Sequence, residues 1–247
     1  VSAMILTQFW IRETLPWAKA EAARHAAGTQ ASAVRPRYPR NISSHPSTRE
    51  VFTLMSWRDR RLLALSQAGL VEKFVDALVW VFYPLYLYQQ NLSLTQVASI
   101  ISVYGLTWGG SQLFTGRLSD RIGRHRPNVA GMWLCGAGVA LMVSGQGVLW
   151  WSLSAALSGF GMALLYPNLS AAVADIAHPN WRGSAIGIYR FWRDLGYGIG
   201  ALGLGLAAHF SGQVEAAFWF VALSMFASGG VLWWLGEETH PRLNPAA

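Results

Sequence analysis

Three ionisable side chains stand close together inside the long apolar run 62–88: Glu72, Lys73 and Asp76. Buried carboxylates can carry a proton, and such a charged cluster can also bind a substrate. At helical spacing, Glu72 and Asp76 share a face because they are four residues apart, and Lys73 can pair with Asp76 three residues on. The spacing equally permits a mutually neutralised structural cluster, which is the alternative interpretation.

A second charged cluster, Arg190, Arg193 and Asp194, interrupts the apolar run 184–209. Charges deep in a membrane cost roughly 2.5–3.5 kcal/mol each on insertion scales, so they must face protein or water. If the two apolar runs touch, carboxylates of the first can pair with arginines of the second. Protonation of one carboxylate would then release an arginine. We therefore expect an intramembrane ion network that joins the two clusters.

Long apolar segments must position these charges. Only 13% of the residues are charged, against about 25% in ordinary soluble domains, so a soluble globule could not cover its surface. Each segment is long enough to cross a bilayer, where the backbone must satisfy its own hydrogen bonds. The sequence therefore predicts an all-α integral membrane protein with six spans. They run over 62–88, 95–115, 128–146, 149–175, 184–209 and 216–235.

The remaining stretches complete the predicted organisation. Residues 1–11 are apolar but too short to span, so we interpret them as the end of a truncated transmembrane helix. Residues 12–61 are rich in Arg, Pro and Ser and are predicted to be a flexible central linker. Residues 62–235 are expected to form the bundle of six spans, and 236–247 a tail.

Basic residues alternate between the connections. The net charge is +7, and Lys and Arg gather in the linker, in the loop after the second span and after the fourth. The connections around 89–94, 147–148 and 210–215 contain neither. This alternation matches the positive-inside bias, so we expect a multi-pass protein of the cell membrane with both ends of this chain cytoplasmic.

The loop after the second span reads GRLSDRIGRHR and begins at Gly116. Gly116 and Gly123 allow a tight turn and a close approach of helices. Asp120 can cap a helix or pair with Arg121 or Arg124, and such a pair can latch one conformation and break in another. Positive charge as a topology signal alone is the simpler alternative, but it does not require this spacing.

This spacing resembles the signature loop of the major facilitator superfamily. In that family Gly, Leu, Asp, Arg, Gly and Arg recur at these offsets between the second and third helices of each six-helix half. His125 is a departure, because Lys or Arg is more usual there. The stretch 166–200 is also similar to the connection between the fourth and fifth helices of such a half. There Asp175 is expected near Arg121 or Arg124, as their acidic partner.

The resemblance covers nearly the whole chain as the C-terminal half of a twelve-helix transporter, which implies a missing N-terminal half. It implies transport of a small molecule by alternating access, with no cofactor or metal. We expect proton-coupled efflux. The expected substrate and proton site is Glu72, Lys73, Asp76, Arg190, Arg193 and Asp194, and the expected latch is Gly116, Asp120, Arg121, Gly123, Arg124 and Asp175.

Two further patterns concern helix packing. Gly196 and Gly200 give the small-xxx-small spacing that lets helices approach closely. Tyr104, Trp108 and Gln112 recur at four-residue spacing and face either a cavity or a neighbouring helix.

Two other functional classes are alternatives. A membrane-embedded enzyme would need a catalytic motif, but the histidines fall in loops or at span ends, and the sequence has no nucleophile elbow, zinc-binding His pair or phosphate loop. The single cysteine, Cys135, excludes a disulfide within the chain. A receptor or regulator would need a signalling domain, and none is visible. No nucleic-acid partner is expected, because the basic residues lie between apolar runs.

Overall fold

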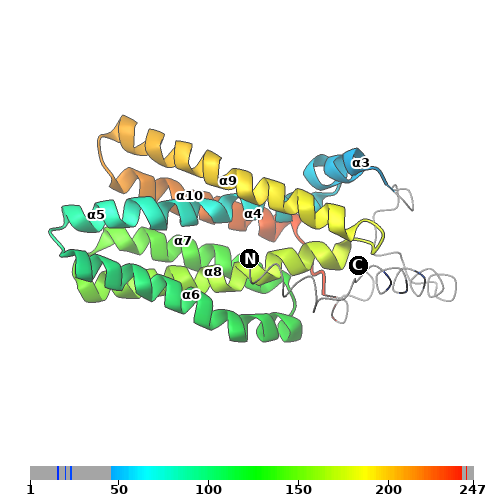
Figure 1. Ribbon diagram of the computed structural model, residues 1–247, viewed down its shortest axis with the longest axis horizontal. Coiled ribbons are helices and arrows are strands. Elements are labelled where there is room, and N and C mark those ends of the chain that lie inside the picture. Colours follow the sequence, from blue (N-terminus) through cyan, green and yellow to red (C-terminus); the bar gives the residue numbers. More distant parts are fainter. Residues whose placement is uncertain (1–15, 17–19, 21–22, 24–45, 241–242, 244–247) are drawn as a thin grey trace, which may run out of the picture.

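The computed structural model describes residues 46–240 together with Pro16, Ala20, Ala23 and Leu243. The expected helix end at 1–11, and most of the linker up to residue 45, therefore lie outside the described residues. Within the described part every regular element is helical (Figure 1). The elements are α3 (Thr48–Thr53), η1 (Leu54–Arg58), α4 (Arg60–Ala77), η2 (Leu78–Phe82), α5 (Tyr83–Gln89), α6 (Leu94–Ile122), α7 (His125–Ser144), α8 (Val148–Ile176), α9 (Arg182–Ser211) and α10 (Glu215–Leu235).

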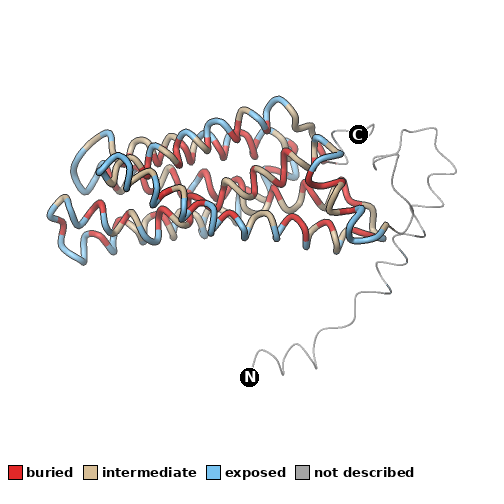
Figure 2. The backbone as a smooth tube through the Cα atoms, turned by 90° about the horizontal axis from the view of Figure 1, so that it is seen from above, coloured by how far each residue is buried: buried red, intermediate tan, exposed pale blue. Residues whose placement is uncertain are grey.

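The long helices run roughly along one axis and pack side by side (Figure 1). α4, η2 and α5 follow one another directly, and the π-helical turn η2 together with Pro84 makes an irregular stretch in this rod. Buried residues line the inner faces of the rods, whereas exposed ones lie on the outside and at the ends (Figure 2).

By length and apolar composition, three of the described helices can cross a membrane: α7, α8 and α10. The expected count of six spans is thus confirmed by this criterion for three only. The other long helices, α4, α6 and α9, do not meet the criterion because they are less apolar. α4 and α9 carry the two charged clusters, and α6 is rich in Ser, Thr and Gly, so their mean hydropathy is lower.

Side-chain caps explain where several of these helices begin. The Asp59 carboxylate accepts hydrogen bonds from the backbone N–H groups of Arg61 and Leu62, at 2.9 and 3.3 Å, which starts α4. A capping box between Ser93 and Gln96 starts α6. These signals are local, because each capping side chain lies within three residues of the backbone groups that it contacts.

Glycine decides how closely α4 and α9 approach. A Cβ atom at Gly196 would overlap the carbonyl oxygen of Leu70, and one at Gly200 would lie 2.7 Å from the Phe74 ring. The predicted small-xxx-small surface is therefore confirmed as a site of tight packing. It brings the two charged runs of the sequence side by side.

The final part of the expected linker is helical and packs against α9. A capping box between Ser47 and Glu50 starts α3. Phe52 stacks on Trp192 with ring centroids 5.9 Å apart, and the indole N–H of Trp192 donates to Ser56 Oγ at 3.0 Å. These contacts attach residues 47–58 to the helix that carries the second charged cluster.

Candidate functional site

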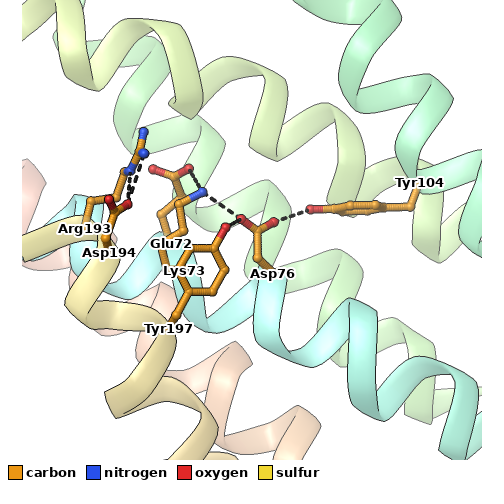
Figure 3. Close-up of polar contacts among 7 residues, drawn as sticks. All are labelled: Glu72, Lys73, Asp76, Tyr104, Arg193, Asp194 and Tyr197. Atoms are coloured by element: carbon orange, nitrogen blue, oxygen red, sulfur yellow. Dashed lines mark hydrogen bonds and ion pairs between the residues drawn. The ribbon is translucent and has the colours of Figure 1, made fainter. Parts of the chain in front are cut away.

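The α4 cluster is an ion triad buried between helices (Figure 3). Lys73 Nζ lies 2.7 Å from Asp76 Oδ2 and 3.4 Å from Glu72 Oε1. The three side chains are 2% exposed or less. Charges so far from water persist only when each is paired, so the lysine is held by its two carboxylate neighbours.

Asp76 joins three helices. The hydroxyl group of Tyr197, on α9, donates to Asp76 Oδ2 at 3.0 Å, and that of Tyr104, on α6, donates to Oδ1 at 3.4 Å. With Lys73, three donors surround this carboxylate (Figure 3). The three hydrogen bonds satisfy this buried carboxylate and fix its position between the helices.

Glu72 has the opposite environment. It is fully buried, and among the described residues neither of its oxygens receives a hydrogen bond. Its one ion pair among the described residues is with Lys73, whose nearer and better aligned partner is Asp76. Burial without hydrogen bonds is unfavourable for a carboxylate, so Glu72 is the less well satisfied of the two carboxylates in the triad.

The α9 cluster meets α4 through tyrosines rather than through the expected arginine ion pairs. Arg193 Nη2 pairs with Asp194 Oδ1 at 3.1 Å, and its guanidinium lies over the Tyr166 ring at 5.4 Å. Arg190 is exposed and makes no ion pair with any residue that the structure describes. Because α4 and α9 touch at the glycine contact, Tyr197 rather than an arginine lies opposite Asp76.

Two aromatic residues of this site were not predicted to belong to it. Tyr166 and Tyr197 both lie close to the ammonium of Lys73, with ring centroids at 5.0 and 5.3 Å. Tyr197 follows Arg193 by one helical turn, a spacing that could have identified it. Of the three residues at four-residue spacing in α6, Tyr104 is buried against the triad, and Trp108 contacts the Tyr166 ring edge-on at 5.6 Å.

The arginine-rich stretch is mostly helix. α6 runs through Gly116 to Ile122, and a Cβ atom at Gly116 would meet no other atom within 4 Å. The expectation that Gly116 provides a turn or a close approach is therefore wrong within the described structure. The turn lies at Gly123, whose φ of +99° is a conformation that favours glycine.

Arg124 is the centre of the contacts in this turn. Its guanidinium pairs with Asp120 at 3.0 Å and with Asp175 at 3.1 Å, and it also donates to Ser119 Oγ at 3.0 Å. Arg121 is exposed and has no ion pair among the described residues. Of the two partners left open by the sequence, the structure selects Arg124, which joins α6, α7 and α8.

Glu238, just beyond α10, completes this end of the bundle and was not predicted from the sequence. Its carboxylate accepts backbone hydrogen bonds from Arg124 and His125 at 2.8 and 3.2 Å, and from His240 at 2.8 Å. It thereby caps α7, which has no side-chain cap of its own. A Cβ atom at position 123 would overlap this carboxylate, so Gly123 is required here for space as well as for its φ angle.

The surroundings of Glu238 lower its pKa. Burial by itself would raise the pKa, but backbone N–H donors from Arg124, His240 and His125 stabilise the charged form and outweigh it. The carboxylate therefore contributes stability that is fully present above its ordinary pKa of 4.5. That contribution is lost as the pH falls through the lowered value.

We expect Glu238→Gln to lower the free energy of unfolding at pH 7 by about 1–2 kcal/mol, because a neutral amide replaces a charged acceptor. Below pH 4.5 the unsubstituted chain should lose stability as its carboxylate is protonated, so the difference between the two proteins should shrink. Thermal unfolding followed by tryptophan fluorescence between pH 3 and 7 measures both effects.

Glu237→Gln is the matched control. Glu237 pairs with Arg60, and the two side chains are 38% and 67% exposed, so this ion pair contributes little. Equal losses of stability in both variants, or a difference that does not change with pH, would show that Glu238 does not cap α7 as described.

The structure thus contains a helical bundle with a buried ion triad at mid-helix and a capped, arginine-centred turn at one end. The described residues hold no group of three or more His, Cys, Asp or Glu side chains placed to bind a metal ion. The architecture is that of an all-α bundle in which three of the described helices are long and apolar enough to cross a membrane.

Comparison with known proteins assigns this bundle to a family. The family model of the Major Facilitator Superfamily matches residues 65–247, and the chain therefore belongs to that superfamily. This confirms the resemblance of the signature loop to that superfamily.

The match with each individual relative covers only part of that relative's length. The chain is 32% identical to multidrug resistance protein MdtH of Cronobacter sakazakii over 53% of this chain and 29% of the relative. It is 32% identical to citrate exporter 1 of Aspergillus niger over 57% of this chain and 26% of the relative. An uncharacterized MFS-type transporter of Salmonella typhimurium is 24% identical, over 53% of this chain and 34% of its own.

Solved structures show the same fold. A peptide transporter POT variant in complex with alafosfalin superposes with a TM-score of 0.64 and 23% identity, over 78% of this chain and 44% of that one. A sulfate complex of the transporter gives a TM-score of 0.60 at 23% identity, over 75% of this chain and 40% of that one. The chain therefore spans less than half the length of these structures.

Proposed function

We propose that this chain is half of a secondary active transporter that exports a small molecule by alternating access, coupled to protons. The observation that carries the proposal is the contrast inside the α4 triad. Asp76 has three donors, whereas Glu72 is fully buried without a hydrogen bond. An intramembrane ionisable group in such a state is a natural site for a transported proton.

Proton uptake at Glu72 would change the charge balance of the triad. With Glu72 neutral, Lys73 has Asp76 as its one remaining ionic partner, and Arg193 keeps its ion pair with the exposed Asp194 but no longer faces the buried Glu72 anion. α4 and α9 would then be held together less strongly by charge, which permits one helix to shift against the other. Substrate and proton would thus act on the same helix pair.

The orientation of the chain across the membrane forms part of the same proposal. We place six spans across the cell membrane, with the Arg124 turn and both ends of this chain in the cytoplasm, because basic residues alternate between connections. Two relatives, a multidrug resistance protein and a citrate exporter, support export as the direction.

We propose that the contacts around Arg124 are the cytoplasmic latch. Asp120, Arg124 and Asp175 form its ion pairs, and Gly123 leaves space for the Glu238 cap. The pairs tie three helices into one unit, so this end of the half moves as a rigid body. Arg121, exposed beside them, remains available for a partner outside the described residues.

The missing N-terminal half is also part of the proposal, and open glycines support it. At Gly105 and Gly109 on α6, and at Gly187 and Gly198 on α9, an added Cβ atom would have no neighbour within 4 Å. Glycine inside a helix costs about 1 kcal/mol relative to alanine. Helical glycines that no described neighbour requires suit a surface where further helices pack closely.

We expect Gly187→Leu to abolish transport while leaving the unfolding temperature of this chain unchanged, because the new side chain protrudes only toward the proposed second half. Leu202→Phe is the control, since Leu202 is exposed on the apolar side of α9. Transport by the Gly187 variant at the unsubstituted rate would contradict the placement of that half.

The proposed function is tested in proteoliposomes that contain the protein together with the sequence preceding Val1 in its reading frame. We expect that sequence to supply five further apolar spans and a second signature loop. A dye inside the vesicles reports proton movement when citrate, dialanine or ethidium is added across a pH gradient. Proton flux that requires one of these compounds supports the proposal, and flux that none of them changes contradicts it for all three classes.

A further inference from the structure

α9 exposes two chemically different faces. One is apolar, with Phe191, Leu202 and Phe210 exposed by 51%, 70% and 81%. The other, which we call the polar face, carries Arg190 and Asp194 among small residues. Lipid can cover the first face, whereas charged side chains require water or protein. Gly187 and Gly198 lie on the same face and border the proposed second half, so a solute held between the two halves would meet α9 at the polar face.

Positive charge dominates among the groups that a solute can reach on the polar face. Arg190 is exposed and has no ion pair with a described residue. Arg193 has one ion pair, with its sequence neighbour Asp194, whose side chain is 58% exposed. The Arg193 side chain is only 14% exposed, so Asp194 is the partner that solvent screens and that a better-placed anion can replace. Two guanidinium groups thus stand against one carboxylate.

The carboxylates of α4 do not offset this charge for an incoming solute. Asp76 is already occupied by three donors, and Glu72 is 0% exposed. A cationic solute would have to displace Lys73 to reach either of them. An anionic solute needs only to replace Asp194 at Arg193.

Aromatic rings adjoin the guanidinium groups. The Tyr166 ring lies 5.4 Å from the Arg193 guanidinium carbon, and Trp108 packs edge-on against the same ring. The Tyr166 ring positions Arg193, and Lys73 also lies over it at 5.0 Å, so the flat apolar surface left for a solute is that of the half-buried Trp108 ring beside it. A solute with an anionic group and a planar apolar part would use both features.

We infer that the transported substrate is an organic anion with a planar apolar part, and that Arg190 and Arg193 bind its carboxylate or phosphate-type group. The inference rests on the proposed transport function and names the substrate class. Arginine suits this role because its planar fork matches two anionic oxygens at once.

Three matched probes test the inference: 2-naphthoate, 2-naphthamide and 2-naphthylmethylammonium. They share one ring system and differ in charge. Binding to the purified full-length protein is measured by quenching of tryptophan fluorescence. We expect naphthoate to bind at least roughly tenfold more tightly than either other probe, because hydrogen bonds to charged groups are the stronger ones.

Substitution of the two arginines tests whether they bind the carboxylate of naphthoate. Arg193→Gln and Arg190→Gln should each weaken naphthoate binding by roughly tenfold and leave naphthamide binding unchanged. Arg49→Gln, at an exposed arginine on α3, is the control and should change neither. Preference for the ammonium or the amide, equal binding of all three probes, binding of none, or unchanged naphthoate binding in both variants would each overturn the inference.

The outcomes separate this inference from the proposed function. Naphthoate preference without substrate-dependent proton flux would leave the anion site standing and refute proton-coupled transport. Substrate-dependent proton flux without naphthoate preference would leave proton-coupled transport standing and refute the anion site.

Discussion

Replacing Asp76 with Asn is expected to lower the free energy of unfolding by about 3 kcal/mol or more, because it removes the charge that balances a buried lysine. Lys73 would keep only Glu72, at 3.4 Å, and the hydroxyl groups of Tyr104 and Tyr197 would lose a charged acceptor. Cys135, the chain's single cysteine, is fully buried, so its reaction with a thiol-specific dye on heating reports unfolding.

Glu72→Gln is the matched variant, for which we expect little change in stability but a loss of proton-driven transport. Its oxygens already lack hydrogen bonds, and Lys73 keeps Asp76 at 2.7 Å, so we expect stability to change by less than about 1 kcal/mol. Transport driven by a pH gradient should be lost, because a glutamine side chain carries no transferable proton. Unchanged proton-driven transport in this variant would refute Glu72 as the proton site, and equal stability losses in both variants would refute their different roles.

The second large effect is expected at the contact between α4 and α9. Gly196→Ala places a Cβ atom onto the backbone carbonyl of Leu70, so the helices must separate. Overpacking of this kind costs about 1–3 kcal/mol, and we expect the upper part of that range because backbone atoms cannot rotate away. Separation should also weaken the hydrogen bond between Tyr197 and Asp76.

Gly198→Ala is the control two residues away. A Cβ atom there meets nothing within 4 Å, so this chain should be unchanged or stabilised by up to about 1 kcal/mol through helix propensity. The dye reaction at Cys135 measures both variants. A Gly196 variant as stable as the Gly198 variant would show that the close approach does not hold the two helices together.

The sequence by itself determined the class of the protein. Low charge content, long apolar runs and alternating basic connections predict a helical membrane bundle without any tertiary information, because hydrocarbon admits few backbone conformations. The signature loop identified the superfamily, which the family match over residues 65–247 confirms. Local spacing also predicted the pairing of Lys73 with Asp76, since both lie on one turn of one helix.

Only the tertiary structure decided which partners lie across helices. It selected Arg124 over Arg121 for Asp175, and tyrosines over arginines for Asp76. It also brought Glu238, distant in sequence, onto the start of α7. Helical periodicity specifies which residues share a face of one helix, but the rotation and depth of one helix against another depend on packing. Here that packing is set by the glycines of α9, where their missing Cβ atoms let α4 approach.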